Sequence, residues 1–403
     1  MKRQIGGSNP LSHPKGGKMD VIKLTKQLIS IPSWVDKKTD ERKIGEFIYG
    51  YLKQFKWLEV IKQPIINNRF NIIAKNEYPT NLLLLGHMDT VQQKQGWKTD
   101  PLDGVIKNER IYGLGAADMK GNLSAILASL ANIKKTKGLM LVFYIDEEYD
   151  FLGTKKFLKE YKNKIKPKLI ISGDSGNLKI GQGCRGLIEI DFKVRGITGH
   201  AANPALGKNT ILGSFQAIEQ VRNYFKDFST ESLGKTSLNL AYLQGGLDLG
   251  QDRQGNQKYG REGNNIPDLT EFIIDIRPAS LDLTTQKIIS KMAELLGNGG
   301  LTLIQTKVSH DLKPWLTKDK DIKRLISLFE KEGCSKRSEP GKRGFIDVQM
   351  FWETFKKVPC LTFGAGEEFL AHKPNEFVKI TELKKATQIY TKIIKDFTIK
   401  DES

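Results

Sequence analysis

Three continuous apolar runs constrain the fold of this 403-residue chain most strongly. They are residues 81–87 (NLLLLGH), 139–148 (LMLVFYIDEE) and 168–174 (KLIISGD). Runs without polar alternation are typical of strands that are buried on both faces of a parallel or mixed sheet. A helical pattern at residues 121–135 lies between the first two runs. This alternation predicts an α/β fold with a mixed, mostly parallel sheet and helices on both faces.

The pattern changes near residue 183. Residues 187–196 alternate strictly between apolar and polar, as in a strand with one wet face. The segments that follow predict a β-α-β-β-α-β order, which is a small α+β domain inserted into the larger one. We therefore expect a flexible leader or tag at residues 1–18, and a large domain at 19–182 and 311–403 that is interrupted by an insert at 183–310.

Composition excludes several classes of protein. Lysine and arginine outnumber aspartate and glutamate by 64 to 46, for a formal net charge of +18, but they are spread along the whole chain. They are not clustered with aromatic residues, so nucleic-acid binding is not favoured. Three widely spaced cysteines form no disulfide framework and fit a reducing cytoplasm. No apolar run approaches the roughly 18 residues of a membrane span, and the polar leader does not read as a signal peptide.

One motif indicates a different function and is rejected. Residues 181–186 (GQGCRG) have the spacing of a dinucleotide-binding loop. That loop must lead into a helix N-terminus that holds the pyrophosphate, whereas an alternating strand pattern follows here. We interpret the segment as a hinge at the domain junction.

Metal-binding residue types stand at the ends of all three buried strands. They are His87 with Asp89, the acidic run 146–148, and Asp174, while Asp118 lies in a glycine-bounded loop before a helix. Ligands of such sheets bind outside the carboxyl ends of the strands. Carboxylates gathered there would repel one another unless a cation holds them. The pattern therefore predicts a metal site.

The residue types also indicate which metal. Histidine and carboxylate ligands without cysteine suit zinc or a similar divalent ion, with cobalt or manganese as alternatives. There are too many carboxylates for one tetrahedral site, which suggests two ions about 3.5–4 Å apart. A second histidine is then expected. His13 lies in the leader, and His310 stands at a predicted strand end away from the acidic residues at the three buried strands, so His200 and His372 remain.

Six segments, in order, resemble the dinuclear zinc amidohydrolase and metallopeptidase family. They are GHMDTV, GLGAADMKG, DEEYDFLG, SGDSG, GITGHAANP and AHKPNEFV. The family includes acetylornithine deacetylase, succinyl-diaminopimelate desuccinylase, aminoacylase and glutamate carboxypeptidase, and the resemblance covers residues 19–400. It implies that the large domain is catalytic and that the insert is a lid that also forms a homodimer.

The resemblance assigns a ligand set. His87 and Asp174 would bind one ion, Glu148 and His372 the other, and Asp118 would bridge them. In many relatives the peptide bond after the bridging aspartate is cis, so the resemblance implies a cis bond between Asp118 and Met119.

The resemblance also assigns residues around the ligands. Asp89 would orient His87 through the second imidazole nitrogen. Glu147 would be the general base, since neighbours on an extended chain point to opposite sides and Glu148 is the ligand. From the lid, His200 would cross to the partner subunit's site to stabilise the oxyanion. Asn264 and Arg277 would touch the substrate.

The sequence departs from its relatives near the substrate. Asp347 stands where relatives have an aspartate, but Phe345 and Ile346 replace small hydroxyl residues. Glu367 and Glu368 add acidic groups at the expected pocket rim. We interpret them first as solvated loop charges, with selection for a basic substrate side chain as the alternative.

The sequence therefore predicts a cytoplasmic two-metal hydrolase of amide bonds in amino-acid metabolism. Its substrate would be a small N-acyl amino acid or a short peptide. A dipeptidase or carboxypeptidase of the same family is the alternative. A non-catalytic binding relative is a distant alternative, because it would have lost a ligand or Glu147, and all are present.

Overall fold

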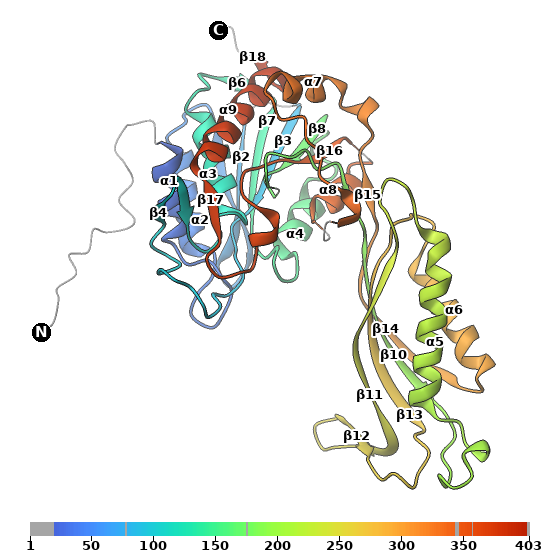
Figure 1. Ribbon diagram of the computed structural model, residues 1–403. Coiled ribbons are helices and arrows are strands. Elements are labelled where there is room, and N and C mark those ends of the chain that lie inside the picture. Colours follow the sequence, from blue (N-terminus) through green and yellow to red (C-terminus); the bar gives the residue numbers. More distant parts are fainter. Residues whose placement is uncertain (1–19, 77–78, 175, 343–345, 357, 401–403) are drawn as a thin grey trace, which may run out of the picture. The chain divides into compact units, whose positions relative to one another are not determined.

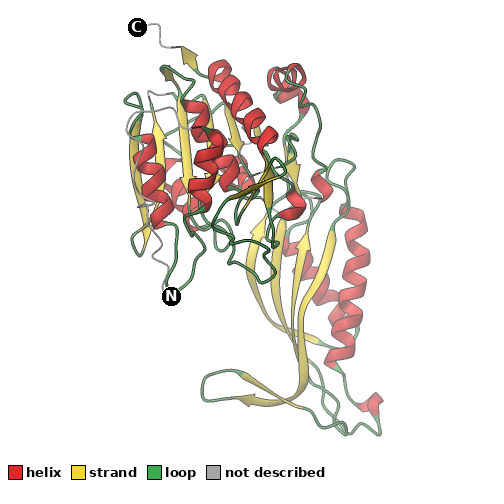
Figure 2. Cartoon of the chain, turned by 60° about the vertical axis from the view of Figure 1, so that its left-hand side comes forward, coloured by secondary structure: helices red, strands yellow, loops and turns green. Residues whose placement is uncertain are grey.

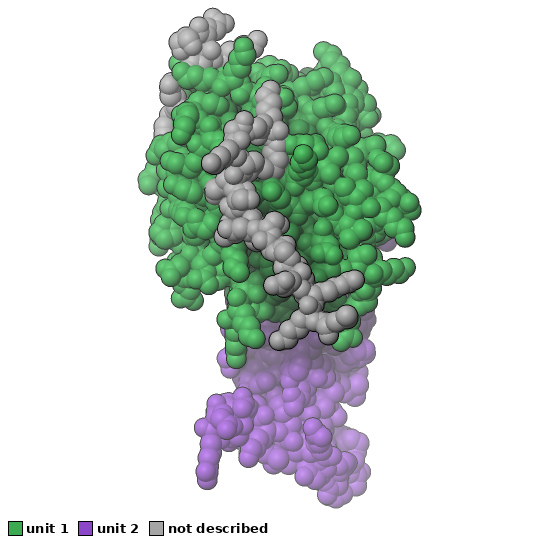
Figure 3. Space-filling view, turned by 90° about the vertical axis from the view of Figure 1, so that its left-hand side faces the viewer, with its two compact units in different colours: residues 1–182, 317–338, 346–403 green, residues 183–316, 339–345 purple. Residues whose placement is uncertain are grey.

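The computed structural model describes residues 20–76, 79–174, 176–342, 346–356 and 358–400. The chain forms two compact units, coloured separately in Figure 3. Unit 1 comprises residues 1–182, 317–338 and 346–403, and unit 2 comprises residues 183–316 and 339–345. Unit 2 thus takes in residues 311–316 and 339–345, which the sequence division assigned to the large domain. The expected leader, residues 1–18, lies outside the described residues.

Unit 1 contains a six-stranded sheet in the order β1-β2-β7-β3-β8-β16 (Figure 1). Its strands are β1 (Glu59–Ile66), β2 (Arg69–Lys75), β3 (Leu82–His87), β7 (Leu139–Tyr144), β8 (Leu169–Ser172) and β16 (Cys360–Thr362). The last four in spatial order pair in parallel, whereas β2 pairs antiparallel with both of its neighbours, β1 and β7. Every residue of β3 and β7 is buried. The predicted mixed, mostly parallel sheet is confirmed.

Helices cover both faces of this sheet, as predicted (Figure 2). They are α1 (Val21–Ile29), α2 (Arg42–Leu52), α3 (Lys120–Leu130), α4 (Leu152–Tyr161), α7 (Lys323–Lys331), α8 (Val348–Thr354) and α9 (Ile380–Phe397). On one face α1, α3 and α9 pack together, and on the other α4 and α8 contact each other. All of α3 is buried, because its glycine, alanine and serine residues let the sheet and α9 approach closely. The start of α3 is thereby fixed beside the strand ends.

Short strands join distant segments of unit 1. A three-stranded sheet contains β4 (Val105–Lys107), β5 (Arg110–Tyr112) and β17 (Phe377–Lys379), and β6 (Thr136–Lys137) pairs with β18 (Ile399–Lys400). The 3-10 turns of unit 1 are η3 (Asp319–Asp321) and η5 (Glu368–Leu370). The pairing of β17 with β5 brings the segment around residue 376 beside the loop that leads into α3. Among the described residues, no helix is both long and apolar enough to cross a bilayer.

Unit 2 is a five-stranded antiparallel sheet with two helices on one face (Figure 2). In spatial order its strands are β12 (Gln257–Gly260), β11 (Ser237–Gln251), β13 (Leu269–Arg277), β10 (Leu187–Arg195) and β14 (Thr302–Leu312), and its helices are α5 (Thr210–Tyr224) and α6 (Thr285–Asn298). Every second residue of β10 is buried with both helices in one core. Its turns are η1 (Pro204–Leu206), η2 (Phe225–Phe228) and η4 (Pro340–Lys342).

Two features of unit 2 bear on the sequence predictions. The sequence pattern of residues 236–246 (TSLNLAYLQGG) predicts a strand that ends at Gly245 and Gly246, but β11 continues to Gln251 and forms a hairpin with β12. Glycine is needed inside this strand, because a Cβ at Gly245 would lie 2.5 Å from the Thr270 hydroxyl. The rejected dinucleotide motif forms β9 (Gly183–Cys184), which pairs with β15 (Trp315–Leu316), and the strand β10 follows it.

Candidate metal centre

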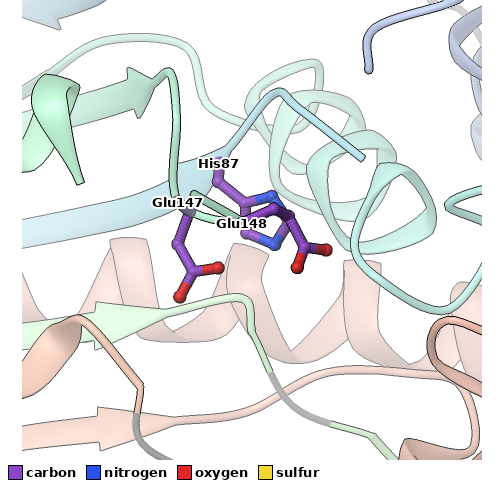
Figure 4. A group of neighbouring side chains, drawn as sticks. All are labelled: His87, Glu147 and Glu148. Carbon is purple, nitrogen blue, oxygen red and sulfur yellow. The ribbon is translucent and has the colours of Figure 1, made fainter. Parts of the chain in front are cut away.

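The five residues expected to bind metal converge in unit 1. Their ligand atoms form overlapping groups within 4.8 Å of one another, among them His87 with Asp118 and Asp174, and Asp118 with Glu148 and His372. A third group joins His87 to Glu147 and Glu148, shown in Figure 4. These residues come from the ends of β3, β7 and β8, the loop before α3, and the segment before β17. The sheet edge therefore gathers them, as the strand-end argument requires.

Asp118 lies between the two histidines. One carboxylate oxygen is 3.1 Å from His87 Nε2, and the other is 3.4 Å from His372 Nε2. His372 Nε2 is also 2.9 Å from Glu148 Oε2. Each oxygen of Asp118 thus faces a different histidine, which is the arrangement that a carboxylate bridging two cations needs.

The electrostatics of the cluster call for positive charge. Burial disfavours the charged form of Asp118, yet hydrogen bonds with His372 and His87 hold the pKa of its carboxyl well below the usual range. Hydrogen bonds with Asp118 and Glu148 raise the pKa of His372 to about 10. Burial raises the pKa of Glu147 well above its ordinary value. Imidazoles and carboxylates that stabilise one another's charge in this way fit a site for divalent cations.

Asp89 joins the two halves of the cluster. Its side chain is fully buried, and Oδ2 accepts the backbone N–H of Glu148 at 2.9 Å. Its Oδ1 lies 3.6 Å from His87 Nδ1, which is closer to the Asp89 carbonyl oxygen, at 3.1 Å. In this structure the backbone of Asp89 contacts the imidazole of His87, while its carboxylate holds the turn that carries Glu148.

Glu376 has a role in the site that was not predicted from the sequence. This buried carboxylate accepts the N–H groups of Ala117 at 2.7 Å, Asp118 at 2.9 Å and Gly115 at 3.0 Å. It therefore holds the whole loop that presents Asp118. The available signal was its position, four residues after His372 in the same segment and directly before a strand.

Met119 anchors the other side of this loop. The Asp118–Met119 peptide bond is cis, as in the relatives described above. The Met119 side chain fits between two glycines at strand ends, because a Cβ at Gly86 would lie 2.8 Å from its methyl carbon and one at Gly173 would lie 2.6 Å from it. Its sulfur also accepts the backbone N–H of His87 at 3.3 Å. The position of Asp118 thus depends on the packing of its neighbour.

Asp347 occupies a second buried polar site. It accepts hydrogen bonds from the Tyr144 hydroxyl at 2.9 Å and the Thr154 hydroxyl at 2.6 Å. Burial raises the pKa of Asp347 to about 6. Ile346 beside it is buried, and Phe345 lies outside the described residues.

The acidic rim is partly neutralised. Glu367 is 2.7 Å from Lys379 Nζ, which also contacts Glu382 at 2.9 Å. An ion-paired Glu367 attracts a basic substrate side chain less than a free carboxylate would. Glu368 lies in η5.

The three residues that the resemblance assigned to a lid lie in unit 2. His200 is exposed and forms an isolated bridge with Asn265, so Asn264 lies beside it. The Asn264 carbonyl accepts the N–H of Ala201 at 2.8 Å. Arg277, at the end of β13, is paired with Asp275 by two hydrogen bonds of 2.8 and 3.0 Å. The guanidinium fork is therefore held by a carboxylate of its own strand.

The chain is similar to proteins of known family. The family model described as peptidase family M20/M25/M40 matches residues 83–396. An acetylornithine deacetylase from Buchnera aphidicola subsp. Schizaphis graminum is 29% identical over 396 residues, which cover 93% of this chain and 97% of that protein. An acetylornithine deacetylase from Pasteurella multocida is 26% identical over 394 residues, with the same coverage of 93% and 97%.

Solved structures share the fold. An aminopeptidase from Bacillus cereus superposes with a TM-score of 0.74 at 18% identity, covering 94% of this chain and 100% of that one. A dinuclear metal-binding peptidase of the M20 family from Bacillus subtilis superposes with a TM-score of 0.67 at 14% identity, covering 93% and 96%.

Proposed function

Because this chain belongs to the peptidase family M20/M25/M40, we propose that it is a two-metal hydrolase that removes the acyl group from N-acyl amino acids. This match confirms the family resemblance of the six sequence segments. It also confirms the prediction that the chain is a metal-binding hydrolase. The observation that carries the proposal is the carboxylate of Asp118 between His87 and His372.

The donor set fits two divalent cations. His87 and Asp174 would hold one, Glu148 and His372 the other, and Asp118 would contact both. Zinc suits these ligands best, with cobalt or manganese as alternatives. When bound, two such ions supply Lewis acidity towards the amide carbonyl and towards water.

Glu147 is the proposed general base. It is the residue next to Glu148, and its carboxylate lies in the same group as His87. Burial raises the pKa of Glu147, which favours a carboxyl that both accepts and returns a proton. Glu147 takes the proton of the attacking water and delivers it to the leaving nitrogen.

Unit 2 is proposed to supply the remaining groups. We infer a homodimer in which the partner's exposed His200 stabilises the oxyanion. Asn264, its neighbour, and Arg277 would bind the substrate, with Arg277 exchanging Asp275 for the substrate carboxylate. Three buried cysteines that form no disulfide support a cytoplasmic location.

Deacylation is favoured by the relatives, since acetylornithine deacetylases align over 97% of their own length. Peptidase activity is the second candidate, because peptidases of the family share the fold. A non-catalytic relative is disfavoured, because every expected ligand and Glu147 lie in the cluster.

A substrate panel tests the proposal. The wild type, Glu147→Ala and the control Glu59→Ala, which changes an exposed glutamate on β1, are assayed on N-acyl amino acids and dipeptides with added Zn²⁺ or Co²⁺. We expect metal-dependent release of the acyl group by the wild type and control and about 10²–10⁴-fold less by Glu147→Ala. Activity without metal, or full activity in Glu147→Ala, would contradict the mechanism. Preferred cleavage of dipeptides would select the second candidate.

Subunit mixing tests the role of His200. Glu147→Ala and His200→Ala proteins, each inactive alone, should regain activity when mixed if His200 acts across a dimer. Mixed dimers without activity would exclude that role.

A further inference from the structure

Arg69 is buried close to the candidate metal centre, although the mechanism above does not use it. It is the first residue of β2, and only 10% of its side chain is exposed. Its Nε and Nη2 donate to the two carboxylate oxygens of Glu41 at 2.7 and 2.6 Å. Nη2 also donates to Asp146 Oδ1 at 2.6 Å. One guanidinium thus joins the start of α2 to the turn after β7.

Asp146 is held from both sides. It has a φ of +70°, in the left-handed region that aspartate tolerates better than most residues. Its second carboxylate oxygen accepts the N–H groups of Asp150 at 3.2 Å and Leu152 at 3.4 Å. Its own N–H donates to Glu41 at 3.1 Å. Asp146 therefore closes the turn with one oxygen and is tied to Arg69 by the other.

This turn carries the proposed base and a proposed ligand. Glu147 and Glu148 directly follow Asp146, and the Glu148 N–H is held by Asp89. Both residues lie in the turn itself, so a rotation of its backbone would misdirect both carboxylates. The backbone at Asp146 is consequently the point where their directions are set.

Charge makes Arg69 necessary at this point. Without its guanidinium, the carboxylates of Glu41 and Asp146 would face each other in a buried space, close to Asp89. An uncompensated buried charge is strongly unfavourable, so the turn would move or take up a proton. Lysine would supply the charge but not a fork that reaches two carboxylates.

We propose that Arg69 is a positioning residue which, acting through Asp146, directs Glu147 and Glu148 into the metal centre. This inference rests on the proposed function for the roles of the two glutamates. The inference goes beyond the proposed function, because neither Arg69 nor Glu41 is assigned there as a metal ligand or as the base. A purely structural role would lower the stability of unit 1 and leave the metal centre unchanged.

The test measures zinc affinity together with kinetics. Wild type, Arg69→Met, Arg69→Lys, Asp146→Asn and the double variant Arg69→Met/Asp146→Asn are freed of metal and titrated with Zn²⁺ by calorimetry. Arg195→Met is the matched control, because Arg195 also contacts two carboxylates, Asp248 at 2.8 Å and Asp268 at 3.6 Å, on the sheet of unit 2. Urea unfolding of the same metal-free proteins records stability separately.

We expect Arg69→Met to lower zinc affinity and kcat by about 10- to 100-fold, the range found for groups that orient metal ligands. KM should change little, because substrate contacts are untouched. Arg69→Lys should recover part of the loss. The double variant should be no worse than the more impaired single variant, since both residues act through one turn.

Two results would overturn the proposal. One is a variant Arg69→Met that is less stable but keeps wild-type zinc affinity and kcat. The other is a double variant whose losses multiply. If Arg69→Met does not fold, Arg69→Lys decides: reduced zinc affinity in a folded protein supports the proposal, and unchanged affinity overturns it. A wild type that binds zinc but cleaves no amide would refute the proposed function, while the zinc affinities would still test Arg69.

Discussion

A methyl group added at Gly86 would test how the strand end before His87 fixes the metal centre. In Gly86→Ala the new carbon would lie 2.6 Å from Leu123 Cδ2 and 2.8 Å from the Met119 methyl. Carbon atoms pack best at about 3.5–4.0 Å, so both side chains must move. Both are buried in the core of unit 1, which leaves them little room.

The expected destabilisation follows from these contacts. Overpacking of this kind costs about 1–3 kcal/mol. A shift of Met119 also weakens the bond from the His87 N–H to its sulfur, 3.3 Å long. Alanine also reduces the conformational entropy of the unfolded chain relative to glycine, which raises the free energy of unfolding by about 0.4–1 kcal/mol. The free energy of unfolding should therefore fall by about 0.5–2.5 kcal/mol, and zinc affinity should fall with it, because Asp118 precedes Met119.

Urea unfolding of the metal-free protein measures this change. The control Gly297→Ala lies in α6, where a Cβ meets no atom within 4 Å, and should be more stable by about 0.5–1 kcal/mol. Met119→Ala alone should cost about 2–5 kcal/mol. When Met119→Ala is made together with Gly86→Ala, its cost in free energy of unfolding should be smaller by at least about 1 kcal/mol, because it removes the methyl group that the new Cβ meets. Additive losses, or a Gly86→Ala protein as stable as wild type, would refute the reasoning.

Three further predictions concern the buried carboxylates. Since burial raises the pKa of Asp347 to about 6, from 3.8, the native state binds this proton more tightly than the unfolded chain. The free energy of unfolding should thus fall by roughly 3 kcal/mol as the pH rises from about 4 to 6. The variant Asp347→Asn should remove this fall when unfolding is measured at several pH values. The same fall in the variant would contradict the assignment to Asp347. In Glu376→Gln the side-chain NH₂ would face at least one of the three backbone N–H groups that donate to Glu376. The free energy of unfolding in urea should fall by about 1.5–3 kcal/mol. An unchanged urea midpoint would exclude the carboxylate as the group that holds this loop. Removal of metal by a chelator should lower the midpoint of thermal unfolding. Zn²⁺ added back at a thousand times its Kd should raise the free energy of unfolding by about 4 kcal/mol. A midpoint that does not change with the chelator would mean that no ion binds.

The convergence of the strand-end side chains can be predicted from the sequence because strand burial and strand ends are both local signals. Runs of apolar residues identify β3, β7 and β8. The carboxyl ends of parallel strands meet at one edge, so His87, Glu148 and Asp174 could be expected to converge, and the structure places them in overlapping groups.

The supporting contacts could not be predicted in the same way. Arg69 reads as a polar residue at a strand start, and its partners Glu41 and Asp146 lie 28 and 77 positions away. The fit of Met119 between two glycines depends on the shapes of three segments at once. Likewise, the paired glycines in β11 looked like a strand end, because their close contact with β13 and β12 is a tertiary feature.

The order of the proposed metal ligands along the chain also sets the order in which the ribosome delivers them. His87, Asp118 and Asp174 are all synthesised before unit 2 begins, whereas His372 follows Glu148 by 224 positions. At about 5–20 residues per second, roughly 10–45 s pass between these two residues. During that time the growing chain also lacks β16, the strand that covers the edge of β8. The residues of one half of the proposed centre are therefore all present on the nascent chain well before His372 completes the other half.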